Sequence, residues 1–377
     1  MSLKSIEGLR GLAALSVVVH HFYNATKTES FLPVGIGLFC QNGLTIFFVL
    51  SGFLLWRPFA KSSIYGSPIR VKTYLLNRFL RIYPTYFAVL SIAWLLGLVL
   101  LQNQNGQLSF PKYGRFENPL MALSGYSLTN TYTKDFGLTG IGPAWSLTAE
   151  IGFYFAIPIL WLIPKHAKSI RLSTWAPSAI LIFIGGCSQV LIWVHHRGMT
   201  DQASWEASWG PTWSMVFERS FLAQAHFFGF GTAAATAAAY WSGQSNPPWP
   251  RSFHSFTGWG VVAFSVAMIV IEKNSPSIQC AFGALFAVYL SLHERQASKS
   301  FILDSGLIKY SGKVSYPIYL VHMPMLAFLH FQGVLNAHSA AQSYFTLCVL
   351  IAATLAFSSI LHFAIEKPFL SLKRIWN

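Results

Sequence analysis

Charged side chains are scarce in this sequence. Lysine, arginine, aspartate and glutamate make up 10% of its 377 residues, whereas a soluble domain carries about 25%. Hydrophobic residues account for 53% and aromatic residues for 16%. A soluble fold of this length could bury a large core, but its surface would need far more charge. The shortage of charge therefore excludes an ordinary soluble domain and predicts a polytopic membrane protein.

Acidic residues and cysteines are rarer still. The 12 acidic residues stand against 26 lysines and arginines, which gives a net charge of +14. In a soluble protein this charge would suggest nucleic acid. Here the basic residues cluster in short loops, which indicates membrane topology and no nucleic-acid partner. The four cysteines are far apart in apolar stretches, so we expect small packing residues rather than disulfides or metal ligands: Cys40, Cys187, Cys280 and Cys348.

The sequence also lacks a signal-peptide cleavage site, an internal repeat and a soluble segment. We therefore expect a retained first span and one membrane-embedded domain over residues 1–377, with no fused soluble domain. Long apolar runs are abundant instead, and a span needs roughly 20 mostly apolar residues. The pattern predicts an all-α bundle of about ten transmembrane helices. Their approximate ranges are 9–25, 38–56, 80–101, 143–163, 175–195, 215–240, 256–272, 276–293, 314–331 and 342–364.

The distribution of charge predicts the orientation of these spans. With the N-terminus inside, most lysines and arginines fall in inner segments, which favours both termini in the cytoplasm. Two long segments then lie outside. Residues 102–142 are long enough to form a functional loop or lid. Residues 196–214 carry Trp205, Trp209 and Trp213 at four-residue spacing, which fits either an interfacial aromatic belt or a sugar-stacking platform.

The first span, EGLRGLAALSVVVHHFY, has ionisable side chains at both ends of an apolar run. Arg10 and His21 share one helix face at about 100° per residue, and roughly 16 Å separates them along the axis. His20 points about 100° away from His21 and cannot have the same role. The pair is either two boundary anchors or one polar face that lines a cavity, because an unpaired ionisable group in a bilayer is costly.

Three further groups are candidates for chemistry. Arg78 and Arg81 are neighbours on one helix face, and paired guanidiniums bind phosphate well, although positive-inside topology also explains them. Glu150 lies well inside an apolar helix, and an intramembrane carboxylate is a functional candidate. Because Glu150 and His21 both fall in the outer half, the carboxylate could orient the histidine. Ser51 would need a nearby base to act as a nucleophile.

The ninth predicted span has a polar face. His322 follows Tyr316 and Tyr319 at three-residue steps, so the three side chains lie on one side of the helix. Such a face can line a cavity, and a hydrogen-bonded core histidine explains it equally well.

Six motifs in a fixed order resemble acyltransferase family 3, the integral-membrane acyltransferases of bacteria and animals. They span nearly the whole chain: EGLRGLAALSVVVHH, FFVLSGFLL, RFLRIYP, AWSLTAEIGFYF, GKVSYPIYLVHMP and AIEKPF. The resemblance implies a multi-pass enzyme of the bacterial inner membrane, in contact with lipid. It implies transfer of an acyl group, by family frequency acetyl, from cytoplasmic acyl-CoA to a carbohydrate hydroxyl, and no metal.

The resemblance also implies roles for individual residues. Arg10 and His21 match the family's arginine–histidine motif, and Arg78 and Arg81 match its arginine pair, which is associated with the acyl-CoA donor. We expect Arg10 to contact the donor as well, and we assign catalysis to His21, Glu150 and Arg10. The residues that we expect to bind substrate are Trp145, Ser146, Tyr154, Tyr319 and His322.

In the expected mechanism, neutral His21 is the general base for the acceptor hydroxyl, and Glu150 orients it or stabilises its cation. The hydroxyl then attacks the thioester directly, or the protein first holds the acyl group covalently. A transporter or flippase is the competing class, since it too would have many spans and a buried glutamate. The sequence has no visible inverted repeat, which counts against a transporter.

Overall fold

The apolar segments fold as helices because a helix satisfies its backbone polar groups internally, which a bilayer requires. The computed structural model describes residues 3–26, 33–100, 116, 118–137, 139–162, 170–242, 251–293, 303–335 and 339–375. Over these residues the structure consists of helices and turns without a β-strand. The prediction of an all-α bundle is confirmed. Part of the predicted 102–142 loop lies outside the described residues.

The helices follow one another closely along the chain. The first part contains α1 (Leu3–Thr26), α2 (Val34–Cys40), α3 (Gly43–Tyr65), α4 (Val71–Leu100), α5 (Pro119–Tyr126), η1 (Asn130–Tyr132), η2 (Gly142–Ala144) and α6 (Trp145–Leu162). The middle contains α7 (Ile170–His196), α8 (Asp201–Trp209), α9 (Trp213–Glu218), α10 (Phe221–Ser242), α11 (Arg251–Ile271) and α12 (Pro276–His293). The last part contains α13 (Gly306–Lys313), α14 (Ser315–Phe331), α15 (Ala340–Leu361), the π-helical turn η4 (His362–Glu366), α16 (Lys367–Ser371) and η5 (Leu372–Ile375).

Seven helical segments in the described part of the chain are long and apolar enough to cross a membrane, and the protein is a multi-pass membrane protein. The segments are Val34–Tyr65, Val71–Leu96, Gly142–Leu162, Thr174–His196, Phe253–Ile271, Pro276–His293 and Ala340–Ser371. The other predicted spans also fall on helices, namely α1, α10 and α14. Polar side chains such as Arg10, His226 and His322 interrupt these three helices.

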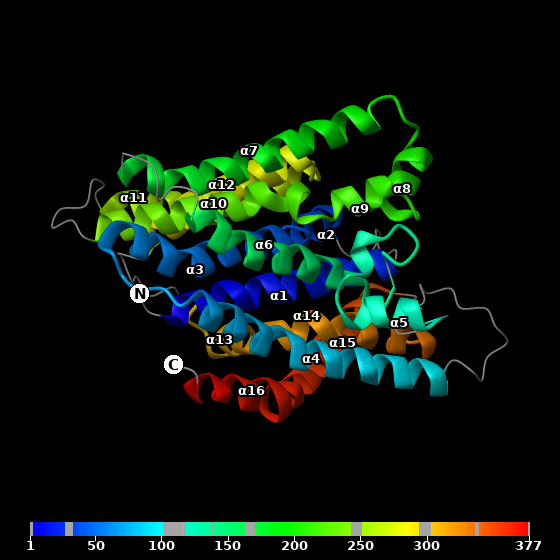
Figure 1. Cartoon of the computed structure of the whole chain (residues 1–377). Coiled ribbons are helices and arrows are strands. Elements are labelled where there is room, and N and C mark those ends of the chain that lie inside the picture. The colour runs from blue at the N-terminus through cyan, green and yellow to red at the C-terminus, as the bar shows by residue number, and fades with distance from the viewer. Residues whose placement is uncertain are drawn as a thin grey trace.

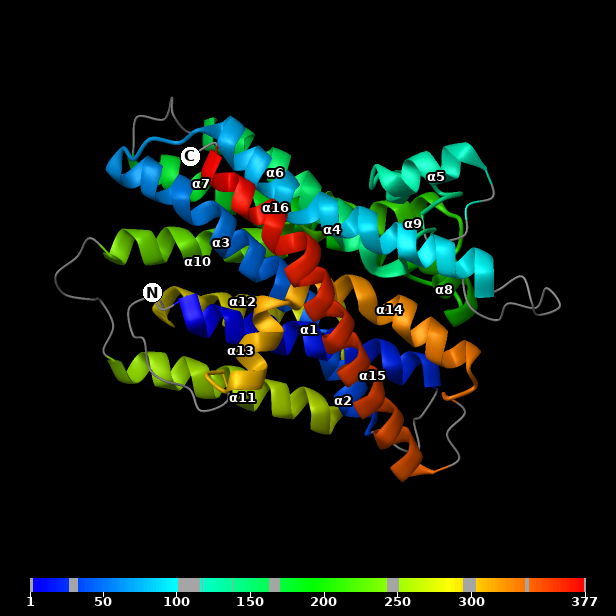
Figure 2. The same cartoon turned by 90° about the horizontal axis from the view of Figure 1, so that it is seen from below.

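The bundle has two distinct ends (Figure 1). Both chain termini lie toward one end, and the short helices α5, α8 and α9 lie at the other, as the perpendicular view also shows (Figure 2). We call the first the terminus end and the second the cap end. Helix α1 runs from the terminus end toward the cap end, so it carries Arg10 nearer the former and His21 nearer the latter.

Small residues let the central helices approach closely. Gly52 on α3 faces Gly231 on α10, and a Cβ on either one would collide with the backbone of the other helix. A Cβ on Gly312 of α13 would likewise collide with the carbonyl of Glu7 on α1. In lipid, where water does not drive helices together, such close packing is a main source of association. These contacts hold α3 against α10 and α1 against α13 at short distances.

Candidate active site

One cavity lies where α1, α3, α4, α6 and α14 meet. Its volume is about 100 Å³. Most of the residues that the sequence predicted for the site line this cavity: Arg10, Arg78, Arg81, Ser146, Glu150, Tyr154 and Tyr319. The predicted residues that lie outside its lining are His21, Trp145 and His322. The structure therefore gathers in one place side chains that are far apart in the sequence.

Three guanidiniums converge on the cavity. Arg78 and Arg81 come from adjacent turns of α4, and Arg10 comes from α1. Arg10 lies within the electrostatic influence of Arg81, Glu366 and Glu150. The Nε of Arg78 is buried and has no hydrogen-bond partner among the described residues. Like charges gathered with unused donors make a site that an anion such as a phosphate would stabilise.

Glu150 is placed by neighbours that the sequence did not reveal. The hydroxyl of Ser51 on α3 donates a hydrogen bond to Oε1 of Glu150 on α6, with a distance of 2.7 Å. Tyr154, one helical turn further along α6, is also hydrogen-bonded to Glu150. Glu150 thus accepts hydrogen bonds in the cavity wall and faces the guanidiniums of Arg10 and Arg78. Its position suits a counter-ion for the arginines.

The wall on the side of α14 is built from hydroxyl groups. The Tyr319 hydroxyl lies 2.6 Å from Oγ of Ser146 and 2.8 Å from the carbonyl oxygen of Pro143. The Tyr316 hydroxyl donates to the carbonyl of Ile82 on α4 at 2.7 Å. These bonds join α14 to α4 and to the start of α6. They hold the polar face of α14 toward the cavity, as the three-residue spacing predicts.

His21 meets His322 at the cap side of this wall. Nδ1 of His21 lies 2.9 Å from the carbonyl oxygen of Val17 and 3.3 Å from Nε2 of His322. Nδ1 of His322 lies 3.2 Å from the carbonyl oxygen of Ile318. A ring nitrogen that faces a carbonyl oxygen must carry hydrogen, so in the neutral pair both Nδ1 atoms are protonated. His322 Nε2 is then an acceptor for His21, and Nε2 of His21 is left as a basic nitrogen.

The predicted pairing of His21 with Glu150 is therefore wrong. Among the described residues His21 has no hydrogen bond to Glu150, and its partner on a neighbouring helix is His322. The two rings lie 5.0 Å apart between centroids, and the His322 ring lies 5.8 Å from that of Tyr319, which lines the cavity. His20 points elsewhere, as predicted, and its Nδ1 lies 3.0 Å from the carbonyl oxygen of Gly37.

The C-terminal segment supplies His362 and Lys373, to which sequence analysis gave no role, and it gives a partner to Glu366 of the AIEKPF motif. In the π-helical turn η4, Nδ1 of His362 lies 2.7 Å from Oε2 of Glu366, and both side chains are buried. Lys373 follows in η5, near the guanidiniums of Arg78 and Arg81. Burial, together with the two guanidiniums, lowers the pKa of Lys373 to about 8. In the sequence, Lys373 is a lysine shortly after an apolar span. The positive-inside rule explains such a lysine by itself, so the sequence did not single it out as a site residue.

The chain is similar in sequence to known proteins. A family described as an acyltransferase domain matches residues 3–363. Nodulation protein 10 of Rhizobium leguminosarum bv. viciae is 25% identical over 330 residues, which cover 84% of this chain and 80% of that protein. Acyltransferase MdmB of Streptomyces mycarofaciens is 23% identical over 395 residues, covering 98% and 92%. No solved structure matches the chain.

Proposed function

This chain belongs to the family of the acyltransferase domain, and from that premise we propose that it transfers an acyl group, acetyl by preference, from acyl-CoA to a sugar hydroxyl. The acceptor is a surface polysaccharide, an exopolysaccharide or a lipid-linked oligosaccharide. The protein lies in a bacterial inner membrane, with the terminus end in the cytoplasm because most basic residues flank that side. The donor then enters at the terminus end and the acceptor at the cap end.

The observation that carries the proposal is the convergence of Arg10, Arg78 and Arg81 on one cavity. Coenzyme A carries several phosphates, and guanidiniums bind phosphate oxygens through planar, paired hydrogen bonds. The remaining wall leads through Tyr319 to the histidine pair. A donor held by its phosphates at the arginines can extend its thin pantetheine arm along α1 toward His21.

The reaction follows from the state of His21. Its basic Nε2 takes the proton from the acceptor hydroxyl while the oxygen attacks the thioester carbonyl carbon, and a C–O bond forms as the C–S bond breaks. The proton passes from His21 to the departing thiolate, which leaves as coenzyme A. The carbonyl of Val17 and Nε2 of His322 both face the His21 Nδ1–H, and together they hold His21 in the required tautomer. This is the orienting role that the sequence assigned to Glu150.

The test is donor turnover by the purified protein in lipid nanodiscs. Radiolabelled acetyl-CoA, supplied with glycans extracted from cells that lack the protein, should yield labelled glycan and free coenzyme A. Mass spectrometry of the same glycans from cells with and without the protein should differ by one acyl group. Transport of an unmodified glycan without release of coenzyme A would contradict the proposal and indicate a transporter.

The same preparation separates direct transfer from an acyl-enzyme. With acetyl-CoA and no acceptor, direct transfer predicts unmodified protein, whereas a covalent mechanism predicts an added acetyl group on a peptide that contains His21.

A further inference from the structure

The cap end carries aromatic surface that the active-site cavity does not use. We call helices α8 and α9 with the residues between them, 201–218, the α8–α9 cap. Its tryptophans Trp205, Trp209 and Trp213 are 63%, 51% and 66% exposed. Trp205 and Trp209 are four residues apart in α8, so they lie on one helix face. Exposed aromatic side chains at this position belong either to a membrane interface or to a ligand site.

Trp209 differs from an ordinary surface tryptophan because a buried cation lies against it. The guanidinium of Arg219 is 4.3 Å from the ring centroid of Trp209, and Arg219 is only 5% exposed. One Nη donates to the carbonyl of Ser208, while the buried Nε has no hydrogen-bond partner among the described residues. The cation is attracted to the ring face, so it fixes the orientation of the indole. The exposed part of Trp209 is thus a flat, rigid surface.

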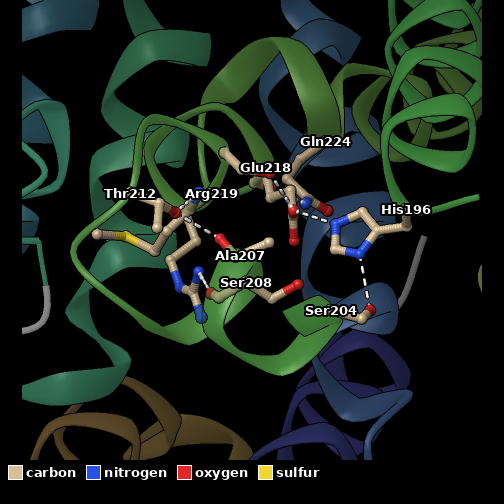
Figure 3. A network of polar contacts seen from close by, with 10 residues as sticks. His196, Ser204, Ala207, Ser208, Thr212, Glu218, Arg219 and Gln224 are labelled. Atoms are coloured by element: carbon tan, nitrogen blue, oxygen red, sulfur yellow. Dashed lines mark hydrogen bonds and ion pairs between the residues drawn. The ribbon is translucent and has the colours of Figure 1, made fainter. Parts of the chain in front are cut away.

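The rest of the cap is also held in one arrangement (Figure 3). His196, at the end of α7, lies 2.7 Å from Oγ of Ser204 on α8 and 2.7 Å from Oε1 of Glu218 on α9. The side-chain amide of Gln224 donates to the carbonyl of Glu218 at 2.9 Å. A binding surface that is already ordered avoids the entropy cost of ordering it on binding.

The cap is linked to the cavity through Trp145. The same guanidinium of Arg219 lies 5.8 Å from the ring centroid of Trp145. Trp145 in turn contacts Phe48 edge-on, with 6.4 Å between ring centroids. Phe48 and Ser146, the residue after Trp145, both line the cavity. Three packed side chains, Trp209, Arg219 and Trp145, therefore lie between a molecule on the exposed face of Trp209 and Phe48 of the cavity wall.

A second arginine–tryptophan pair shows what a membrane-interface pair looks like in this protein. Arg197, in the turn directly after α7, lies 5.3 Å from the ring of Trp193 in the last turn of that helix, and both side chains are exposed. Such an open pair is typical of an interfacial belt. In α8, by contrast, the exposed side chains beside the tryptophans include Asp201, Gln202 and Glu206. Carboxylates repel anionic lipid headgroups, whereas carboxylate and amide oxygens accept hydrogen bonds from hydroxyl groups.

We propose that the α8–α9 cap is the acceptor subsite and that an uncharged sugar ring of the glycan stacks on Trp209. The apolar C–H face of a pyranose covers the exposed indole, and Gln202 and Glu206 hydrogen-bond to its hydroxyl groups. Arg219 is a positioning residue that holds Trp209 and links it to Trp145. The inference rests on the proposed function, because it assigns a place to the acceptor of that reaction.

The test measures binding of free sugars apart from acyl transfer. Protein in lipid nanodiscs, free of glycoside detergents, is titrated with methyl glycosides of neutral hexoses and with their uronic-acid counterparts. Wild-type protein should bind at least one neutral glycoside and bind the uronates more weakly. W209A should weaken that binding about tenfold, which corresponds to about 1.4 kcal/mol, and W209F should restore part of it. R219K should restore binding relative to R219Q.

The matched control is W193A, which removes an exposed tryptophan stacked with an arginine outside the cap. It should bind the glycoside as wild type does. Equal affinity of W209A and wild type, or no binding of any glycoside by wild-type protein, would overturn the proposal. Tighter binding of uronates would overturn the preference for an uncharged ring. If wild-type protein does not turn over acetyl-CoA, the proposed function is refuted instead. An unchanged donor KM in R219Q would show that the cap acts on the acceptor alone.

Discussion

Arginines at the two ends of this molecule lie in contrasting surroundings. In the cap, Arg219 stands alone, stacked against Trp209, with a backbone carbonyl as its hydrogen-bond acceptor. Toward the terminus end, Arg10, Arg78 and Arg81 line a common cavity, where they face one another and Glu150. The stacked Arg219 is held by the Trp209 ring and by one carbonyl, although its buried Nε has no hydrogen-bond partner among the described residues, and it stiffens the cap. Clustered guanidiniums repel one another, and a bound anion would relieve that repulsion.

The contrast separates an architectural arginine from a ligand-binding group. It predicts that substitutions at the terminus end change donor kinetics, whereas substitutions in the cap change acceptor kinetics. In the proposed reaction both substrates meet at His21, which lies between the two ends.

Replacement of His21 by alanine should have the largest effect. Loss of a general base costs roughly 10²- to 10⁴-fold in rate, so kcat should fall by that factor while the dissociation constants of donor and acceptor stay close to wild type. The matched control is H20A, since His20 is adjacent but bonds to the carbonyl of Gly37. Steady-state kinetics and acetyl-CoA binding measure both quantities. If H20A and H21A lose activity equally, His21 has no special role.

Replacement of Arg81 by glutamine should come next. Hydrogen bonds to charged groups contribute about 1.5–3 kcal/mol, so the donor KM should rise roughly ten- to a hundredfold while the acceptor KM is unchanged. Lys72 is the control, because it lies exposed on the same helix and contributes equally to positive-inside topology. A similar rise in donor KM for K72Q would show that general surface charge, and not the cavity, attracts the donor.

Substitutions of His322 and Glu150 should lower activity less than H21A does, and they should affect different kinetic constants. H322F removes one of the two acceptors that face the His21 Nδ1–H and leaves the carbonyl of Val17 in place. A hydrogen bond is worth about 0.5–1.5 kcal/mol, so kcat should fall by at most about tenfold. E150Q removes a charge that faces the arginines, so it should change the donor KM more than kcat. The measurement is steady-state kinetics of both variants, which gives the change in kcat and the change in donor KM separately for each one. The opposite pattern would restore Glu150 as the orienting group.

Much of this arrangement follows from sequence because ionisable side chains are costly in apolar helices. Arg10, Arg78, Arg81 and Glu150 each stand out against an apolar background, and helical periodicity assigns each to a face of its own helix. All four line the same cavity. The cost of burial identifies the residues that the protein must accommodate, and a shared cavity accommodates them together.

Periodicity within one helix does not say which helices are neighbours. The pairing of His21 with His322 joins helices about 300 residues apart in the chain, and the bond from Ser51 to Glu150 joins α3 to α6. Both depend on the packing of the bundle. The π-helical turn η4 shifts the register of the last span by its wider turn, so the place of Glu366 could not be extrapolated from the residues before it.

The smallest predicted effect concerns pH and tests whether Lys373 belongs to the arginine cluster. Burial and the neighbouring guanidiniums lower its pKa from 10.5 to about 8. Lys373 is therefore charged below pH 8 and becomes neutral as the pH rises through that value. The phosphates of the donor are already ionised at pH 7. Acetyl-CoA should thus bind the H21A variant, which cannot turn it over, severalfold more weakly at pH 9 than at pH 7.

K373R in the H21A background is the matched control for this dependence. Arginine keeps its charge over the whole range, so donor affinity should be nearly flat between pH 7 and pH 9. An equal decline in both proteins would place the titrating group elsewhere. If donor affinity falls between pH 7 and pH 9 only in the protein that keeps Lys373, then Lys373 belongs to the cluster of Arg78 and Arg81, although it lies beyond the last span. It would also make the terminus end sensitive to pH in a range where the stacked Arg219 of the cap stays charged.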